Sequence, residues 1–206
     1  MFALSRTLVL CVVFLSIYAD GRGEESICRY CDEGRSHSML PLGLELDGRY
    51  QYAPDRQVDV LHIKLDVTPD FDARTVKGTA TITAKPISKP VEILRLDAID
   101  LQIQAVRCEG AEVDDFISTR DGLQIAFAAA IPIGKKFTVD IEYSAQPNAG
   151  LYFRTAKMGY PERDTHIWTQ GETHEARHWF PCFDYPNERS STEVICHVPP
   201  DMTVLS

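Results

Sequence analysis

Residues 61–67 read L-H-I-K-L-D-V, and residues 76–84 read V-K-G-T-A-T-I-T-A. In both stretches apolar or small residues alternate with polar ones. Successive side chains of a β-strand point to opposite faces, so this period of two places the apolar side chains together on one face. Both stretches are therefore predicted to form strands that are buried on one side.

Shorter runs with the same alternation follow along the chain. They are Val91–Leu96, Leu101–Ala105, Leu123–Phe127, Phe137–Tyr143 and Thr192–Val198. Turn-forming residues separate these runs at the spacing typical of sandwiches, as at Pro69 and Gly122. No helical period of useful length occurs after residue 23. The sequence therefore predicts an all-β fold, an antiparallel β-sandwich.

The first part of the chain has the pattern of an export signal. Arg6 precedes the apolar run Leu8–Ile17, and small residues follow it as candidate cleavage sites. We interpret residues 1–23 as a signal peptide, because the apolar run is shorter than the roughly 20 residues that span a bilayer. Residues 24–54 are polar and Gly-rich, as in a linker, and residues 55–206 form the predicted β-domain. The protein is expected to be periplasmic, extracellular or on the cell surface.

Charge and cysteine content limit the other function classes. The net charge of −9 provides no basic patch for phosphates, so no nucleic-acid partner is expected. Five cysteines follow the signal, and this odd number cannot all pair within the chain. Cys28 and Cys31 form one C-x-x-C without the second pair that a zinc site needs, which leaves a local disulfide or two free thiols.

A short motif in the C-terminal part permits two interpretations. His174, Glu175 and His178 spell H-E-x-x-H, which binds Zn²⁺ when both histidines share one face of a helix. Pro181 follows closely and limits any helix to a turn or two, and Arg177 would place a cation beside the metal. We therefore expect no metal site in this chain, and a zinc peptidase centred on His174 remains as an alternative.

The second interpretation uses the residues around those histidines. The segment contains T-Q-G-E at 169–172, A-R at 176–177 and F-P-C-F-D-Y-P at 180–186. With these spacings it resembles the N-terminal domain of the zinc aminopeptidase family that includes aminopeptidase N. The resemblance extends over about residues 55–206 and departs at Tyr185, where many members have Glu.

The resemblance implies specific roles for this loop. The family's saddle-like β-domain packs on a thermolysin-like catalytic domain of the same polypeptide and contributes a loop to the active-site wall. There Gln170 and Glu172 would bind the substrate, with the Glu172 carboxylate holding the free α-amino group of a peptide. The resemblance covers Arg177, Pro181 and Asp184 as well, and we interpret these three as structural residues of the loop.

The resemblance also implies what this chain lacks. The family's catalytic zinc motif lies beyond the part that corresponds to residue 206, so no catalytic residue is expected here and Zn²⁺ would be bound outside this chain. The apolar-rich run at residues 202–206 carries no terminal turn or polar tail, which suggests that the polypeptide continues. The predicted function is the substrate-anchoring domain of an exported zinc aminopeptidase, inactive by itself. The alternative is a non-catalytic β-sandwich binding module derived from the same family.

Overall fold

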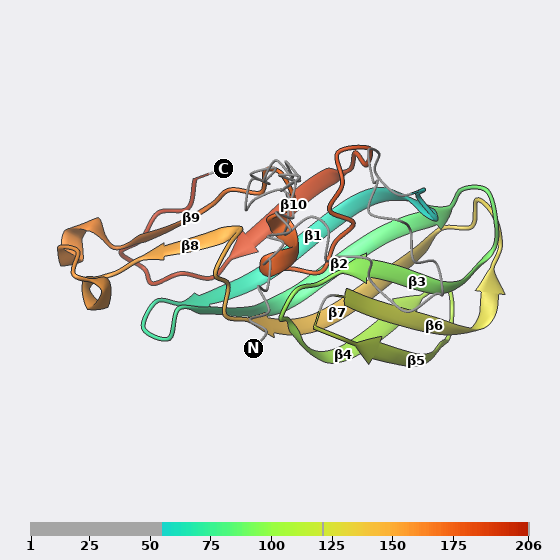
Figure 1. The fold of residues 1–206 in the computed structure, drawn as a ribbon, viewed down its shortest axis with the longest axis horizontal. Helices are drawn as coiled ribbons and strands as arrows, with labels where there is room; N and C mark the ends of the chain where they lie inside the picture. Colours follow the sequence, from blue (N-terminus) through green and yellow to red (C-terminus); the bar gives the residue numbers. More distant parts are fainter. Residues whose placement is uncertain (1–54, 121, 206) are drawn as a thin grey trace, which may run out of the picture.

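The computed structural model describes residues 55–120 and 122–205 (Figure 1). Strands dominate this part, and its helices are three single 3-10 turns. The predicted all-β class is therefore confirmed. The predicted signal peptide, the predicted linker and the Cys28–Cys31 motif all lie outside the described residues.

The strands follow one another along the chain with short connections as far as β8, and a longer connection with two 3-10 turns leads from β8 to β9. They are β1 (Val58–Asp70), β2 (Thr75–Pro86), β3 (Val91–Asp97), β4 (Gln102–Glu109), β5 (Val113–Ser118), β6 (Gly122–Ile131), β7 (Phe137–Ala145), β8 (Leu151–Arg154), β9 (His166–Thr169) and β10 (Ser191–Cys196). The 3-10 turns are η1 (Ala156–Met158), η2 (Glu162–Asp164) and η3 (Ala176–His178). In this described part, no helix is long and apolar enough to cross a membrane.

Two sheets form the body of the domain. The larger has the order β10-β1-β2-β7-β4, and the smaller has the order β3-β6-β5. In Figure 1 the smaller sheet lies over the half of the larger sheet that contains β7 and β4. Neighbouring strands are antiparallel except for β1 and β10, which run parallel. The antiparallel sandwich is thus confirmed, with one parallel edge strand that the alternation does not reveal.

The core lies between these sheets and is built from the alternating apolar residues. On β7 every second side chain from Phe137 to Ala145 is buried, and Leu94 and Ile125 are buried on the facing sheet. The rings of Phe127 and Phe137 meet edge to face with 5.8 Å between centroids, which joins the two sheets directly. The period of two therefore identifies the inward faces of both sheets.

Strand β1 departs from the simple alternation at one residue. The predicted buried face began at Leu61, but Leu61 is only half-buried, whereas Val58 and Val60 before it are buried. The pairing of β1 with β2 shifts register between Val60 and His62. An extra residue in one strand reverses which alternate positions face inward, so the buried face changes from even to odd numbers.

The bulge is stabilised by the segment that leads into β10. The Val60 amide donates to Glu188 Oε2 at 3.3 Å, and the Ser191 hydroxyl donates to the Leu61 carbonyl at 3.1 Å. Glu188 also pairs with Arg56 at 2.6 Å. Backbone groups that a bulge removes from the strand ladder need other partners. The bulge therefore gives the returning chain a place to attach beside β1.

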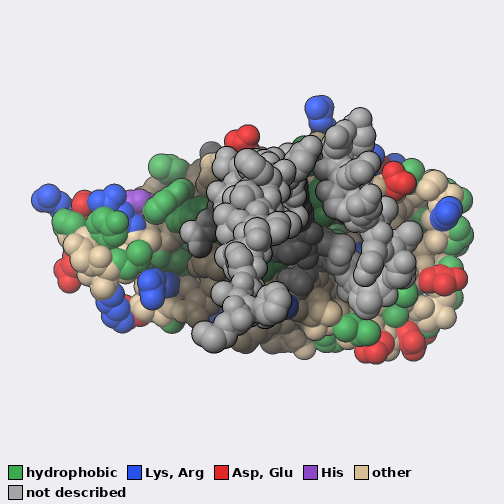
Figure 2. Space-filling view, in the orientation of Figure 1, with side chains coloured by type: hydrophobic (Ala, Val, Ile, Leu, Met, Phe, Trp, Pro, Cys, Tyr) green, Lys and Arg blue, Asp and Glu red, His purple; other side chains and the backbone are tan. Residues whose placement is uncertain are grey.

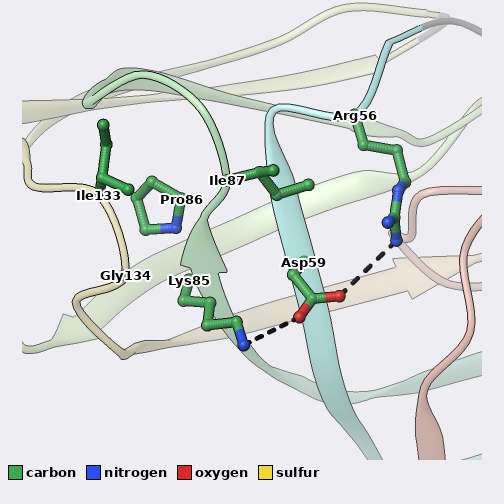
Figure 3. A pocket seen from close by; sticks show the side chains of 7 residues that line it. All are labelled: Arg56, Asp59, Lys85, Pro86, Ile87, Ile133 and Gly134. Atoms are coloured by element: carbon green, nitrogen blue, oxygen red, sulfur yellow. Dashed lines mark ion pairs between the residues drawn. The ribbon is translucent and has the colours of Figure 1, made fainter.

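A shallow hollow of about 490 Å³ lies at one end of the sandwich (Figure 3). Ile87 and Ile133 line it together with Asp59, which pairs with Arg56 at 3.7 Å and Lys85 at 3.1 Å. These charged side chains already have partners within the domain. The lining includes neither Gln170 nor Glu172, so this hollow is separate from the predicted substrate loop.

Candidate substrate-facing loop

The loop with the T-Q-G-E motif starts at the end of the β8–β9 hairpin. Gln170 still belongs to the hairpin ladder, because its amide donates to the Gly150 carbonyl at 3.0 Å. Gly171 to His174 then cross exposed surface before the chain turns through η3. The side chains of Gln170 and Glu172 are both on this exposed part. The two predicted substrate-binding residues are therefore accessible in this domain.

Arg177 lies at the base of the loop and is buried. Its Nε and its backbone amide both donate to Asp184 Oδ2, at 3.1 and 3.2 Å, and its Nη2 donates to the Asp184 carbonyl at 2.9 Å. The Arg177 side chain is 3% exposed. These bonds close the chain between the two residues into one turn, in which Pro181 is also fully buried.

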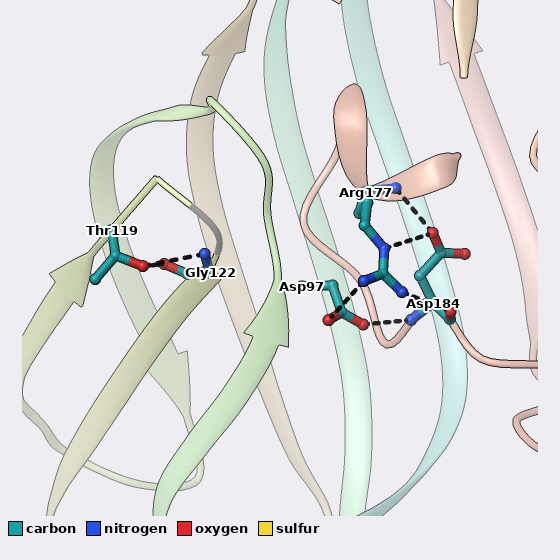
Figure 4. A network of polar contacts seen from close by, with 5 residues as sticks. All are labelled: Asp97, Thr119, Gly122, Arg177 and Asp184. Carbon is teal, nitrogen blue, oxygen red and sulfur yellow. Dashed lines mark hydrogen bonds and ion pairs between the residues drawn. The ribbon is translucent and has the colours of Figure 1, made fainter. Parts of the chain in front are cut away.

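A third charged residue, Asp97, joins the base of the loop to the smaller sheet (Figure 4). Asp97 Oδ1 lies 3.4 Å from Arg177 Nη1, and its Oδ2 accepts the Asp184 amide at 2.9 Å. Its backbone exchanges two hydrogen bonds with Cys182, of 2.7 and 3.0 Å. We call the set Asp97, Arg177 and Asp184 the buried clamp. Because Asp97 ends β3, the clamp fixes the loop to the sandwich.

The charges within the clamp hold one another in place. Burial raises the pKa of Asp97, while the Arg177 guanidinium acts in the opposite direction. Burial would lower the pKa of Arg177, but Asp97, Tyr185 and Asp184 raise it overall. Arg177 therefore stays charged between two carboxylates. A buried cation with its hydrogen bonds satisfied is stable in this place, whereas removal of one partner leaves an uncompensated charge.

Tyr185 packs on the clamp. Arg177 Cζ lies 5.1 Å from the centroid of its ring, within the range of a cation–π contact. The rings of Phe183 and His174 lie 5.0 and 5.5 Å from it. The aromatic ring thus supports the loop from the side of Arg177.

The H-E-x-x-H residues do not have the geometry of a zinc site. Only η3 is helical here, with three residues, so His174 and His178 do not share a face of an α-helix. Within residues 55–120 and 122–205 no three His, Cys, Asp or Glu side chains are grouped as metal ligands. His178 is half-buried, and burial lowers its pKa. These histidines do not fit a bound Zn²⁺.

The structure brings together Arg177 and Asp184, two of the three predicted structural residues of the loop, and it adds two residues that the sequence did not identify. Asp97 is distant in sequence, and its only signal is a carboxylate directly after the apolar run at Leu96. The second additional residue is Gly150, which has a φ of +76°. A Cβ at this position would lie 1.9 Å from the Glu175 carbonyl oxygen, so only glycine fits.

The comparison with protein families assigns this domain. A family described as the peptidase M1 N-terminal domain matches residues 59–206. The match covers most of the chain and includes the strands, the exposed loop and the buried clamp. The chain therefore belongs to the family of peptidase M1 N-terminal domains.

Its curated relatives are aminopeptidases. Leucine aminopeptidase 2 of Saccharomyces cerevisiae is 26% identical over 174 residues, which cover 75% of this chain and 25% of the relative. Aminopeptidase M1-D of Oryza sativa is 28% identical over 150 residues, 69% of this chain and 17% of the relative. The chain thus spans a quarter or less of the length of these relatives.

Solved structures share the fold. Yeast LTA4 hydrolase in complex with bestatin superposes with a TM-score of 0.57 at 24% identity, over 78% of this chain and 28% of that one. An M1 zinc metallopeptidase from Deinococcus radiodurans gives a TM-score of 0.56 at 20% identity, over 70% of this chain and 33% of that one. At these identities the likeness concerns the fold.

Proposed function

We propose that this domain anchors the amino terminus of a peptide substrate in an exported zinc aminopeptidase. Its family and its aminopeptidase relatives support peptide cleavage by a longer protein. The observation that carries the proposal is the exposure of Gln170 and Glu172 on a loop whose base the clamp holds. Zn²⁺ would be bound by a catalytic domain of the same polypeptide, outside this chain.

The chemistry of the two side chains suits a terminal ammonium. A carboxylate and an ammonium form a charge-assisted hydrogen bond, which is stronger than one between neutral groups. The Gln170 amide oxygen can accept a further hydrogen bond from the same group. Such an anchor favours exopeptidase activity, because an internal peptide bond offers no ammonium to Glu172.

The clamp contributes positioning to this function. Displacement of an anchoring group by about 1 Å can lower a rate on the order of 100-fold. Arg177 and Asp184 fix the turn that ends the loop, and Asp97 joins this turn to β3. These residues would therefore act through the placement of Gln170 and Glu172 and would not touch the substrate.

The test is the variant Glu172→Gln in the full-length protein, with kcat/KM measured on matched free-amine and N-acetylated peptides. Loss of a desolvated charge-assisted contact costs about 2 to 4 kcal/mol, or roughly 30-fold to 1000-fold in kcat/KM. We expect this loss with free-amine peptides only. Equal kcat/KM for parent and variant on free-amine peptides would refute the anchoring role.

Metal analysis of the 206-residue chain tests the competing zinc interpretation. We expect no stoichiometric zinc and no aminopeptidase activity, because His174 and His178 lack a shared helical face. One equivalent of zinc that disappears in His174→Ala would show that the H-E-x-x-H motif is a metal site after all.

A further inference from the structure

The β8–β9 hairpin has one face in the core and one face outside it. Leu151 on β8 and Phe153 two residues later are buried, and Ile167 on β9 packs against the same core. Phe153 also meets the ring of Phe71 edge to face, with 6.1 Å between centroids. The alternate residues of both strands therefore point away from the core.

Two aromatic rings lie on the outer face of the hairpin. Tyr152 and Trp168 are directly opposite in the register, and their rings stack with a centroid distance of 5.3 Å and an angle of 19°. His166 lies 5.4 Å from the Trp168 ring. Trp168 is 46% exposed, so about half of a large apolar side chain faces solvent. In Figure 2 hydrophobic side chains are visible among charged ones at this end of the molecule.

The aromatic pair shares its face with Gln170. Trp168 and Gln170 are two residues apart, and the bond from the Gln170 amide to Gly150 extends the antiparallel ladder past Thr169. Side chains two residues apart on a strand lie on the same face, about 7 Å from each other. The Trp168 ring is therefore within one or two extended peptide residues of the proposed anchor for the amino terminus.

The surrounding charges indicate which side chain this surface accepts. The Arg154 guanidinium lies 4.1 Å from the centroid of the Tyr160 ring and 3.8 Å from Asp164 Oδ2. Arg154 pairs with His166 in the register, on the same outer face as Trp168. Asp164 balances the charge of Arg154, so this ion pair offers no net charge that would attract a charged guest. An uncharged aromatic or large apolar side chain is therefore favoured on this surface, because a charged guest would lose hydration without gaining a partner.

We propose that Tyr152 and Trp168 form a subsite for an uncharged aromatic or large apolar side chain among the first three residues of the peptide. The proposal rests on the proposed function, because Gln170 and Glu172 set the position of the amino terminus. The exposed ring of Trp168 provides the contact area, and Tyr152 holds that ring by stacking. Aromatic pairs of this kind prefer offset or edge-on partners, which a Phe or Tyr side chain supplies.

The test uses the full-length protein and four tripeptides: trialanine and the three peptides in which Phe replaces the first, second or third alanine. The parent should cleave at least one Phe peptide with a higher kcat/KM than trialanine. Trp168→Ala should reduce this preference about 10-fold, and Trp168→Phe should keep most of it. Ile117→Ala, which removes another exposed apolar side chain on β5, should leave the preference unchanged.

The outcomes separate this subsite from the anchor. Glu172→Gln should lower kcat/KM for all four peptides by a similar factor, and its failure to do so would remove the proposed function. If Glu172→Gln behaves as expected but Trp168→Ala keeps the Phe preference, the subsite is refuted. An equal loss on all four peptides in Trp168→Ala would also refute it, because that result describes a packing or domain-contact residue.

Discussion

The loop between β9 and β10 has two ends with opposite properties. At its base the side chains of Arg177 and Asp97 are 3% and 5% exposed, and each forms bonds to the others of the clamp. At its start Gln170 and Glu172 are exposed, and the Gln170 amide donates to the Gly150 carbonyl at the end of the hairpin. The same loop thus contains a buried charged scaffold and an accessible polar surface.

This difference shows where stability and binding reside. Buried charges are costly unless each has its partners, so a fully bonded clamp is a structural element. Exposed side chains contribute little to folding, and recognition residues are often found on such exposed loops. Variants at the base should therefore change the free energy of unfolding, and variants at the start of the loop should change activity.

The largest effect is expected from Arg177→Ala. The substitution leaves the carboxylates of Asp97 and Asp184 without their cation in a buried place, which typically costs about 3 to 5 kcal/mol. Urea unfolding followed by circular dichroism measures this loss. Arg177→Lys keeps the charge but loses the planar donor geometry, and an intermediate loss is expected. Arg120→Ala, at a side chain that is 80% exposed, is the control and should leave the urea midpoint unchanged.

Gly150→Ala tests the connection between the hairpin and the base of the loop. Gly150 and Gly134 both have positive φ, +76° and +74°, but only at Gly150 would a Cβ meet other atoms, with the Glu175 carbonyl oxygen at 1.9 Å. The cost of placing alanine at a positive φ is therefore similar at both positions. At Gly150 the clash of the new Cβ adds about 1 to 3 kcal/mol. Equal unfolding free energies for Gly150→Ala and Gly134→Ala would show that the loop adapts without strain.

His178 gives the loop a pH dependence of defined sign. Burial lowers its pKa below the ordinary value of 6.5, so the unfolded chain binds more protons than the folded one in the window below pH 6.5. Stability should rise with pH through this window. Asp97 has a raised pKa and contributes with the opposite sign in a window above 3.8. In His178→Gln the free energy of unfolding should rise less with pH across this range than it does in the parent. An equally steep rise in the variant would contradict the assignment to His178.

The smallest effect on stability is expected from Gln170→Ala. The side chain is exposed, and its bond to Gly150 uses the backbone amide, which the substitution keeps. The free energy of unfolding should change by less than about 0.5 kcal/mol, whereas kcat/KM of the full-length protein on free-amine peptides should fall. A larger loss of stability would place Gln170 in the scaffold and remove the contrast between the two ends of the loop.

The strands were predictable because they depend on local pattern. Alternation at Val76–Ala84 and Phe137–Tyr143 identified buried faces that the structure confirms. The bulge in β1 was not visible, because Leu61 fits the alternation as well as Val60 does. The parallel pairing of β10 was also missed, since the direction of a strand beside its neighbour depends on the path of the preceding loop.

The sequence by itself determined the all-β class, the inward faces of strands such as β2 and β7 and, through the spacing of the T-Q-G-E, A-R and F-P-C-F-D-Y-P motifs, the family of the domain. Only the tertiary structure decided that Asp97 completes the clamp with Arg177 and Asp184, and that Trp168 lies beside Gln170 on the outer face of a hairpin. Pattern records which residues alternate or recur along the chain. The contacts of Asp97 join residues 80 or more apart, and they depend on how two sheets and a returning loop pack, which local spacing does not encode.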